Sequence, residues 1–141
     1  MGAINFYSEN SFVLEKEESF SNWLIRVVSS EGMELEEINY IFCDDEYLLE
    51  INQKYLNHDT YTDIISFDNS VGKILQGDIY VSTERVSENA AEYNVSFINE
   101  LKRVMVHGVL HLCGYKDKSE NEEREMRFKE EEKIKMFHVE Q

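Results

Sequence analysis

Hydrophobic side chains recur along the chain at two spacings, and each spacing predicts a different kind of element. Ile38, Tyr40 and Phe42 alternate with polar residues, which is the period of a half-buried strand, so we expect a strand over residues 37–43. Between residues 15 and 30 apolar side chains instead recur every three or four positions, as on the inner face of an amphipathic helix. We therefore expect a helix there, which ends before Gly32.

The same two periods, together with capping and turn residues, predict the remaining elements. Residues 4–7 predict a short edge strand, and residues 62–67 and 77–82 predict an antiparallel hairpin connected through Gly72. Four further helices are expected, over residues 45–55, 83–94, 96–113 and 120–137. The order of strands and helices indicates an α+β fold, with a small mixed β-sheet packed with about five helices in a single domain spanning residues 1–141.

Two of these helices carry more detailed expectations. In the helix over residues 45–55 the apolar side should consist of four residues, Leu48, Leu49, Ile51 and Leu56. The helix over residues 120–137 is strongly charged, and we expect a solvated helix with i,i+4 pairs of opposite sign. It should dock through Met126, Ile134 and Phe137, and a partner-binding helix is the alternative.

The composition fits a packed core and predicts no membrane-spanning helix. Hydrophobic residues make up 42% of the 141 residues, and no run of about 18 apolar residues occurs. The two cysteines, Cys43 and Cys113, lie far apart in hydrophobic surroundings. We interpret both as buried free thiols, which agrees with a reducing cytoplasm.

The net charge argues against binding a polyanion, but its distribution weakens that argument. Acidic residues outnumber basic ones 29 to 14, and the formal net charge of -15 would repel nucleic acid at long range. Residues 1–75 hold 15 acids and 4 bases, whereas residues 76–141 hold 14 acids and 10 bases. The second half of the chain can therefore still offer a local surface to RNA.

That second half also contains the most informative group of residues, His107, His111 and Asp117. Histidines four positions apart project from one face of a helix, with β-carbons about 5–6 Å apart, so that both imidazoles can meet one metal ion. Gly114 ends the helix and lets the chain fold back, which could return Asp117 to the same ion as a third ligand. Three protein ligands leave a position for water, as catalytic sites do and closed structural sites do not.

Other interpretations of these residues stay open. The two histidines could be structural, hydrogen-bonded to their neighbours, and Cys113 could replace Asp117 as a soft ligand, although it lies only two residues from His111 and should point elsewhere. A zinc peptidase of the His-Glu-x-x-His type is disfavoured, because position 108 is glycine and the motif's general base is missing.

Four segments between residues 36 and 117 carry a family resemblance. The first reads His-Gly-x-Leu-His-Leu-x-Gly-Tyr over residues 107–115. Upstream of it stand Asn52-Gln-Lys-Tyr55 followed by Asp59, then Thr62-Asp63-Ile64-Ile65-Ser66-Phe67, and then Gly77-Asp78-Ile79. In order and spacing these segments resemble the YbeY family of metal-dependent endoribonucleases and rRNA maturation factors.

The resemblance implies a function that the residues alone do not. It implies a bacterial, cytoplasmic, single-strand endoribonuclease that acts in 16S rRNA maturation and ribosome quality control. It also implies one divalent metal ion, with zinc as our expectation, and places His107 and His111 at the positions of the first two family ligands. Its partners would be rRNA or a ribosomal subunit, with ribosomal proteins as further candidates and no membrane.

The chain departs from the family pattern at two positions. The third family ligand is usually histidine, and here Asp117 stands in its place; a carboxylate still binds zinc, and the resulting two-histidine, one-carboxylate set also suits iron. The family usually has an arginine just after the position of Tyr55, thought to serve RNA cleavage, and here that residue is Leu56. Leucine offers a phosphate neither charge nor hydrogen bond, so another cation must substitute or cleavage must be weak.

Several residues near the motif are candidates for contacts with a substrate. Arg103 lies one helical turn before His107, and Arg85, Lys116 and Lys118 also lie near the motif or the hairpin. Each of these cations could equally be a solvated surface charge.

Other polar residues near the motif are also ambiguous. Ser66 could bind substrate or a ligand histidine, and Asp63 could orient a ligand imidazole, although both could equally satisfy strand backbone. His58 and His138 are expected to be exposed and without a role.

Two functions from different classes follow. The first is a metal-dependent single-strand endoribonuclease that holds its metal with His107, His111 and Asp117, with no general base assigned. The second is a non-catalytic ribosome-assembly factor with a structural metal site, for which Leu56 and the net acidity speak. A metallohydrolase acting on another substrate is a third, weaker alternative.

Overall fold

The structure is a computed structural model that describes residues 2–56 and 62–137. Within these residues the chain forms a four-stranded mixed sheet and five helices, which confirms the α+β class. In chain order the elements are β1 (Ala3–Ser8), α1 (Glu17–Ser30), β2 (Glu34–Cys43), α2 (Asp45–Leu56), β3 (Ile64–Asp68), β4 (Ile74–Ser82), α3 (Thr83–Tyr93), α4 (Phe97–Leu112) and α5 (Glu120–Ile134). Each corresponds to an element predicted from the hydrophobic pattern, with ends that differ by a few residues.

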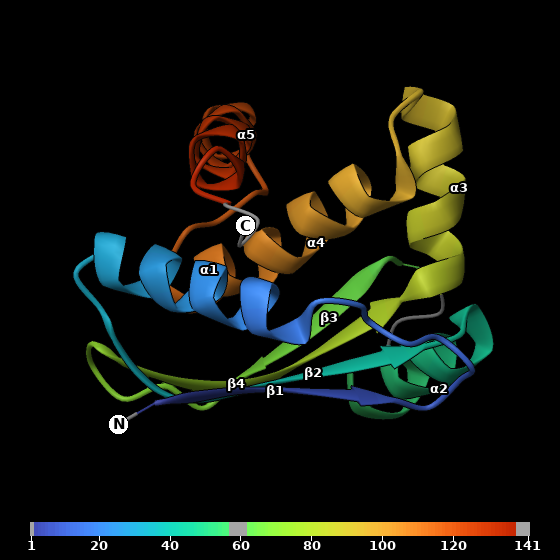
Figure 1. The fold of residues 1–141 in the computed structure, drawn as a ribbon, viewed down its shortest axis with the longest axis horizontal. Helices are drawn as coiled ribbons and strands as arrows, with labels where there is room; N and C mark the ends of the chain where they lie inside the picture. The colour runs from blue at the N-terminus through green and yellow to red at the C-terminus, as the bar shows by residue number, and fades with distance from the viewer. Residues whose placement is uncertain (1, 57–61, 138–141) are drawn as a thin grey trace.

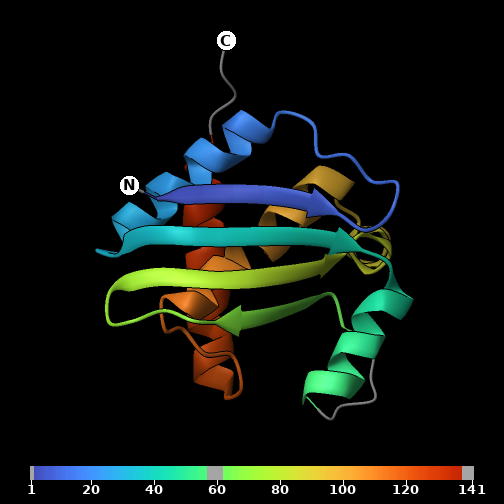
Figure 2. The same cartoon turned by 90° about the horizontal axis from the view of Figure 1, so that it is seen from below.

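The sheet has the strand order β1-β2-β4-β3, which Figure 2 shows face on. β1 runs parallel to β2 and β2 runs parallel to β4, whereas β3 is antiparallel to β4, with Ile64 opposite Val81 and Asp68 opposite Gly77. Gly72 has a φ of 59° in the connection between β3 and β4, a left-handed conformation that glycine adopts without strain. The predicted hairpin and the edge position of β1 are both confirmed, and β3 forms the opposite edge.

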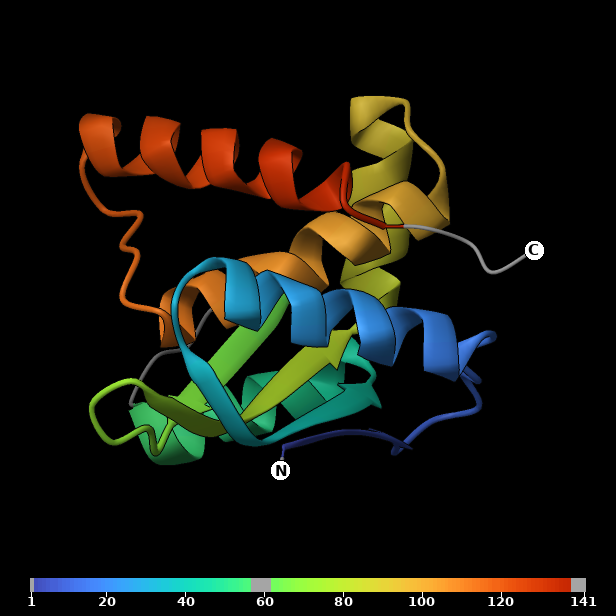
Figure 3. The same cartoon turned by 60° about the vertical axis from the view of Figure 1, so that its left-hand side comes forward.

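The main core lies between the sheet and the helices α1 and α4, which cover one face of the sheet (Figure 1). α5 lies on the other side of α4, away from the sheet (Figure 3). Trp23 of α1 is fully buried, and its Nε1 donates a hydrogen bond of 2.7 Å to the carbonyl oxygen of Lys133 in α5. α4 is therefore packed between the sheet on one side and α5 on the other.

The two ends of α4 follow from its capping residues. Ser96 begins the helix, and its hydroxyl accepts a hydrogen bond of 3.1 Å from the backbone N–H of Asn99. At the other end Gly114 has a φ of 107°, and the N–H of Tyr115 bonds back to the carbonyl oxygen of Leu110 at 3.0 Å. This is the Schellman pattern of a glycine-ended helix, and it sends the chain back along the helix that it has just left.

α2 packs separately, against β3 and β4. Leu48 is buried with Cys43 and Ile65 in a second, smaller cluster, and Leu49 and Ile51 are half-buried. The prediction that Leu56 belongs to the apolar side of this helix is wrong, because its exposed fraction is 40%. Leu56 is the last residue of α2, and it does not belong to the cluster that Leu48 forms with Cys43 and Ile65.

α5 docks as predicted through Met126 and Ile134, and Phe137 docks just after the helix has ended, but α5 is not simply a solvated helix. Its face toward the domain also buries a glutamate and a lysine, Glu130 and Lys133. Two of the ion pairs along the helix join residues three apart rather than the expected four, Arg127 with Glu130 and Lys129 with Glu132. Across the described part of the chain, no helix is long and apolar enough to cross a membrane.

Candidate metal centre

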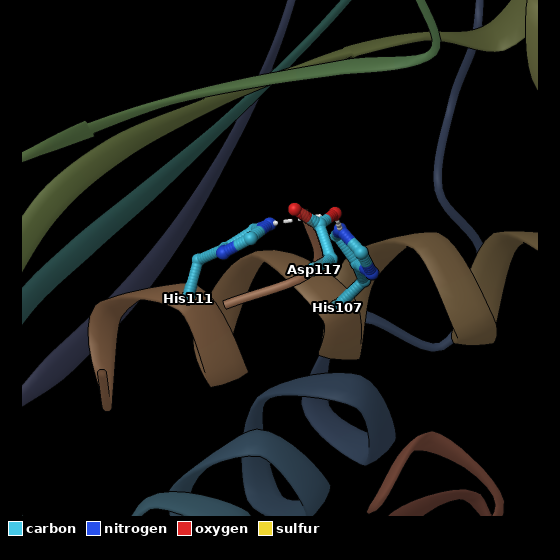
Figure 4. Close-up of side chains that lie close together, drawn as sticks. All are labelled: His107, His111 and Asp117. Atoms are coloured by element: carbon cyan, nitrogen blue, oxygen red, sulfur yellow. Dashed lines mark ion pairs between the residues drawn. The ribbon is translucent and has the colours of Figure 1, made fainter. Parts of the chain in front are cut away.

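The candidate site is built by α4 and the turn that follows it. His107 and His111 lie four residues apart on one face of α4, and the chain reversal at Gly114 brings Asp117 back to them (Figure 4). The Oδ2 atom of Asp117 lies 3.2 Å from Nε2 of His107 and 3.4 Å from Nε2 of His111. The predicted convergence of these three side chains is present.

The spacing of the donor atoms suits a small divalent cation. Ligands that bind zinc tetrahedrally at about 2.0–2.1 Å lie roughly 3.3 Å from one another. The two nitrogen-to-oxygen distances bracket that value, and the three donor atoms all lie within 4.8 Å of one another. Two imidazoles and one carboxylate are also a ligand set found for zinc and iron in proteins, so this group could bind a metal ion.

The other ring nitrogen of each histidine has a hydrogen-bond partner, which fixes how each ring is presented. Nδ1 of His111 lies 2.9 Å from the carbonyl oxygen of Tyr115 in the turn after α4. Nδ1 of His107 lies 2.5 Å from Oε2 of Glu130 in α5. A carbonyl and a carboxylate both accept, so these partners favour the tautomer in which Nδ1 donates and Nε2 is directed at the shared site.

The Glu130 carboxylate is itself held by cations. Its side chain is 2% exposed, and its Oε1 lies 3.3 Å from Nη1 of Arg103. Arg103 also forms an ion pair with the buried Glu100, one turn earlier on α4. Burial alone would lower the pKa of Arg103, but the hydrogen bond and charge of Glu100 and the charge of Glu130 outweigh it and raise the pKa.

Sequence reasoning missed Glu130, although the sequence does hold a signal for it. Met126, Glu130, Ile134 and Phe137 recur at helical spacing, so the glutamate interrupts an apolar face. A charged residue in such a stripe needs a buried partner. Which partner it meets depends on how α5 packs on α4, and the pattern within α5 does not contain that information.

The histidines and the aspartate open into a pocket of about 710 Å³. Its walls come from the end of α2, from β3, from α4 and from the turn before α5. Side chains of Leu56, Asp63, Ser66 and Lys118 line it together with the three candidate ligands. The pocket is large enough for a nucleotide-sized group beside an ion.

Two polar residues predicted near the site, Asp63 just before β3 and Ser66 on β3, line this pocket, and neither is the hydrogen-bond partner of Nδ1 in His107 or His111. The carboxylate of Asp63 accepts a hydrogen bond of 3.3 Å from Nδ2 of Asn89, and burial raises its pKa. Ser66 lies on β3 opposite Ile79 and faces the pocket. The contact expected of Asp63, an acceptor for a ligand imidazole, is made to His107 by Glu130.

The predicted cations are placed very differently from one another. Arg103 pairs with Glu100 and Glu130, and it does not belong to the described residues that line the pocket. Arg85 pairs with Asp45 at 2.9 Å, away from the site. Lys118 does line the pocket, beside Asp117, so it is the predicted cation that a bound phosphate could reach.

Of the remaining residues singled out in the sequence, the structure describes the two cysteines. Cys113 is a free, half-buried thiol that packs against the core, and it is not part of the group that could bind a metal. Desolvation raises the pKa of its thiol to about 12, which disfavours the thiolate that a metal would require. Cys43 is free and fully buried, as expected. His58, Asp59 and His138 lie outside the residues that the structure describes.

Fold and site together define a class of protein, an α+β chain with an open His-His-Asp group that could bind a metal ion. Comparison with known proteins then identifies the family. The chain belongs to the YbeY family, because the family described as "Endoribonuclease YbeY" matches it over residues 4–138. The resemblance inferred from the four motifs is thereby confirmed and extends over nearly the whole chain.

Individual relatives agree with this assignment. The chain is 61% identical to the Endoribonuclease YbeY of Christiangramia forsetii, over 99% of this chain and 98% of that protein. It is 62% identical to the Endoribonuclease YbeY of Flavobacterium johnsoniae, over 98% of this chain and 99% of that protein. The solution structure of TM1509 from Thermotoga maritima matches with a TM-score of 0.66 and 29% identity, covering 95% of this chain and 88% of that one.

Proposed function

We propose that this chain is a metal-dependent endoribonuclease that cleaves single-stranded RNA. One observation carries the proposal, namely that His107, His111 and Asp117 converge in an open pocket of a chain whose relatives are named endoribonucleases. The arrangement fits hydrolysis, because three protein ligands leave room for a water and a substrate oxygen.

In this proposal His107, His111 and Asp117 bind one divalent ion, which we propose is zinc. When bound, such an ion lowers the pKa of a water molecule and stabilises negative charge that develops on a phosphodiester. The carbonyl of Tyr115 and the carboxylate of Glu130 hold the two imidazoles so that both Nε2 atoms face the same point. The aspartate in place of a third histidine reduces the net positive charge of the site.

The pocket walls would position the RNA. Lys118 offers a positive charge to a phosphate next to Asp117, and Ser66 offers a hydroxyl from β3. Leu56 closes the α2 side with an apolar surface that cannot neutralise a phosphate. Charge stabilisation by the protein itself is therefore modest, and the ion carries most of that role.

We further propose that the substrate is rRNA on a ribosomal subunit, in the cytoplasm, during 16S rRNA maturation and ribosome quality control. The support is the role implied by the family resemblance. The net charge of -15 would repel free RNA at long range, so delivery through ribosomal proteins fits this chain better than capture of RNA from solution.

Metal content tests the ligand assignment. Elemental analysis of the purified protein should find one zinc per chain, and His107→Ala and His111→Ala should each lose nearly all of it. Lys116→Ala, next to Asp117 but exposed, is the matched control and should keep the metal. Full metal content in His111→Ala would contradict the assignment.

The alternative function is a ribosome-assembly factor in which the metal only organises the fold. The specific observation in its favour is Leu56, which stands in the pocket where the family resemblance leads us to expect an arginine. In that case loss of the metal would lower the thermal stability of the protein but would remove no RNA cleavage, since there would be none to remove.

A further inference from the structure

We propose that Glu130 is a positioning residue of the metal centre, through which α5 controls how tightly the site binds its ion. The inference rests on the proposed function, because it takes His107 as a ligand. It assigns a role to a residue that no motif marks and to a helix that lies outside the pocket.

The contact itself is unusual for a glutamate on a charged helix. Its side chain is 2% exposed, and Oε2 lies 2.5 Å from Nδ1 of His107. Burial strongly destabilises a carboxylate unless it is paired and hydrogen-bonded, so this placement must be compensated by its partners. The partners are the imidazole of a candidate ligand and the guanidinium of Arg103.

Arg103 holds the carboxylate from the other side. Its Nη1 lies 3.3 Å from Oε1 of Glu130, and its remaining nitrogens bond to the carboxylate of Glu100, which is also 2% exposed. The guanidinium thus connects two buried carboxylates, one on α4 and one on α5. We therefore assign Arg103 to the support of Glu130 rather than to the RNA.

The consequence for the site follows from imidazole chemistry. A carboxylate that accepts a hydrogen bond from Nδ1 fixes the tautomer and the orientation of the ring, and it makes Nε2 a better donor to a cation. For His111 the same task is performed by the carbonyl of Tyr115, within the turn that follows α4. For His107 this task depends on Glu130, which lies 23 residues further along the chain, in α5.

Metal binding and the docking of α5 are therefore coupled. If correct docking of α5 increases the affinity for the ion, then by thermodynamic reciprocity the ion must stabilise the docking of α5. A residue that only completes the core would give no such reciprocal effect.

The test is Glu130→Gln, with Glu131→Gln as the matched control. Both variants remove one negative charge from neighbouring positions of α5, but Glu131 is exposed. Zinc affinity, measured by competition with a chelator, should fall by about 10- to 100-fold in Glu130→Gln and stay near that of the parent in Glu131→Gln. Amide hydrogen exchange of α5 should slow when zinc is added to the parent, and this effect should be lost in Glu130→Gln.

The outcomes distinguish a failure of this inference from a failure of the proposed function. Unchanged zinc affinity in a folded Glu130→Gln protein would overturn the inference and leave the proposed function intact. If Glu130→Gln does not fold, Glu130→Asp takes its place: withdrawing the carboxylate by one methylene should lower zinc affinity, and parent-like affinity would overturn the inference. A parent protein that binds no zinc would instead contradict the proposed function.

Discussion

At the scale of single residues, the two histidines of the site are useful because of what binds their other nitrogens. The carbonyl of Tyr115 and the carboxylate of Glu130 accept from Nδ1, and the two Nε2 atoms lie 3.2 and 3.4 Å from Oδ2 of Asp117. The sequence predicted all three candidate ligands, because helical spacing and a glycine stop are local features. It could not predict Glu130 as a partner, since that contact depends on how two helices pack.

Position 56 provides a prediction at the same scale. Leu56 lines the pocket and is 40% exposed, so an arginine there has room to reach a bound phosphate. We expect Leu56→Arg to raise the rate constant of the RNA cleavage step by roughly 10-fold, since a fixed cation stabilises charge that develops in the transition state. Single-turnover cleavage of a labelled single-stranded RNA measures this.

Leu56→Gln is the control for that prediction, because it adds length and polarity without charge. It should cleave at the rate of the parent. Equal rates for Leu56→Arg and the parent would show that the native chain already supplies the cation, and Lys118 would then be the first residue to replace.

At the scale of elements, the hydrophobic pattern of the sequence predicted the strands and helices, because each of them presents one buried face. The alternation in β2 and the three-to-four spacing in α1 and α4 are visible without any knowledge of the partner element. The failures lie where burial is decided by a distant element. Leu56 continues the apolar face of α2 but is 40% exposed at the wall of the pocket, whereas Glu130 belongs to a charged helix and is buried against its partners on α4.

The β3–β4 hairpin carries the pocket wall, and Gly77 sets the spacing of its two strands. A β-carbon at Gly77 would lie 2.5 Å from the carbonyl oxygen of Phe67, which is backbone and cannot rotate away. Gly77→Ala should therefore destabilise the protein by about 2 kcal/mol, seen as a lower midpoint of thermal unfolding by circular dichroism. Gln76→Ala, on the same strand but exposed, should unfold close to the parent. A Gly77→Ala protein as stable as the parent would show that the strands have more room here than the structure gives them.

At the scale of the whole molecule, the candidate metal centre is assembled from parts that are far apart in the sequence. α4 supplies two histidines, the turn after it supplies Asp117, β3 and the end of α2 supply the pocket walls, and α5 supplies Glu130. The acidity of the chain does not contradict an RNA substrate, because the net charge is -11 over residues 1–75 but only -4 over residues 76–141, which hold the metal motif. The family membership and the geometry of the site both support hydrolysis of RNA as the task of this assembly.

The central claim is that one ion held by His107, His111 and Asp117 is needed for RNA cleavage. The most direct measurement is to strip the protein of metal with a chelator, add zinc back stepwise, and follow cleavage of single-stranded RNA together with the zinc bound. Cleavage should rise in proportion to bound zinc, stop rising at one equivalent, and stay absent in His111→Ala at every zinc concentration. Cleavage by the stripped protein at the rate of the reloaded one would contradict the claim.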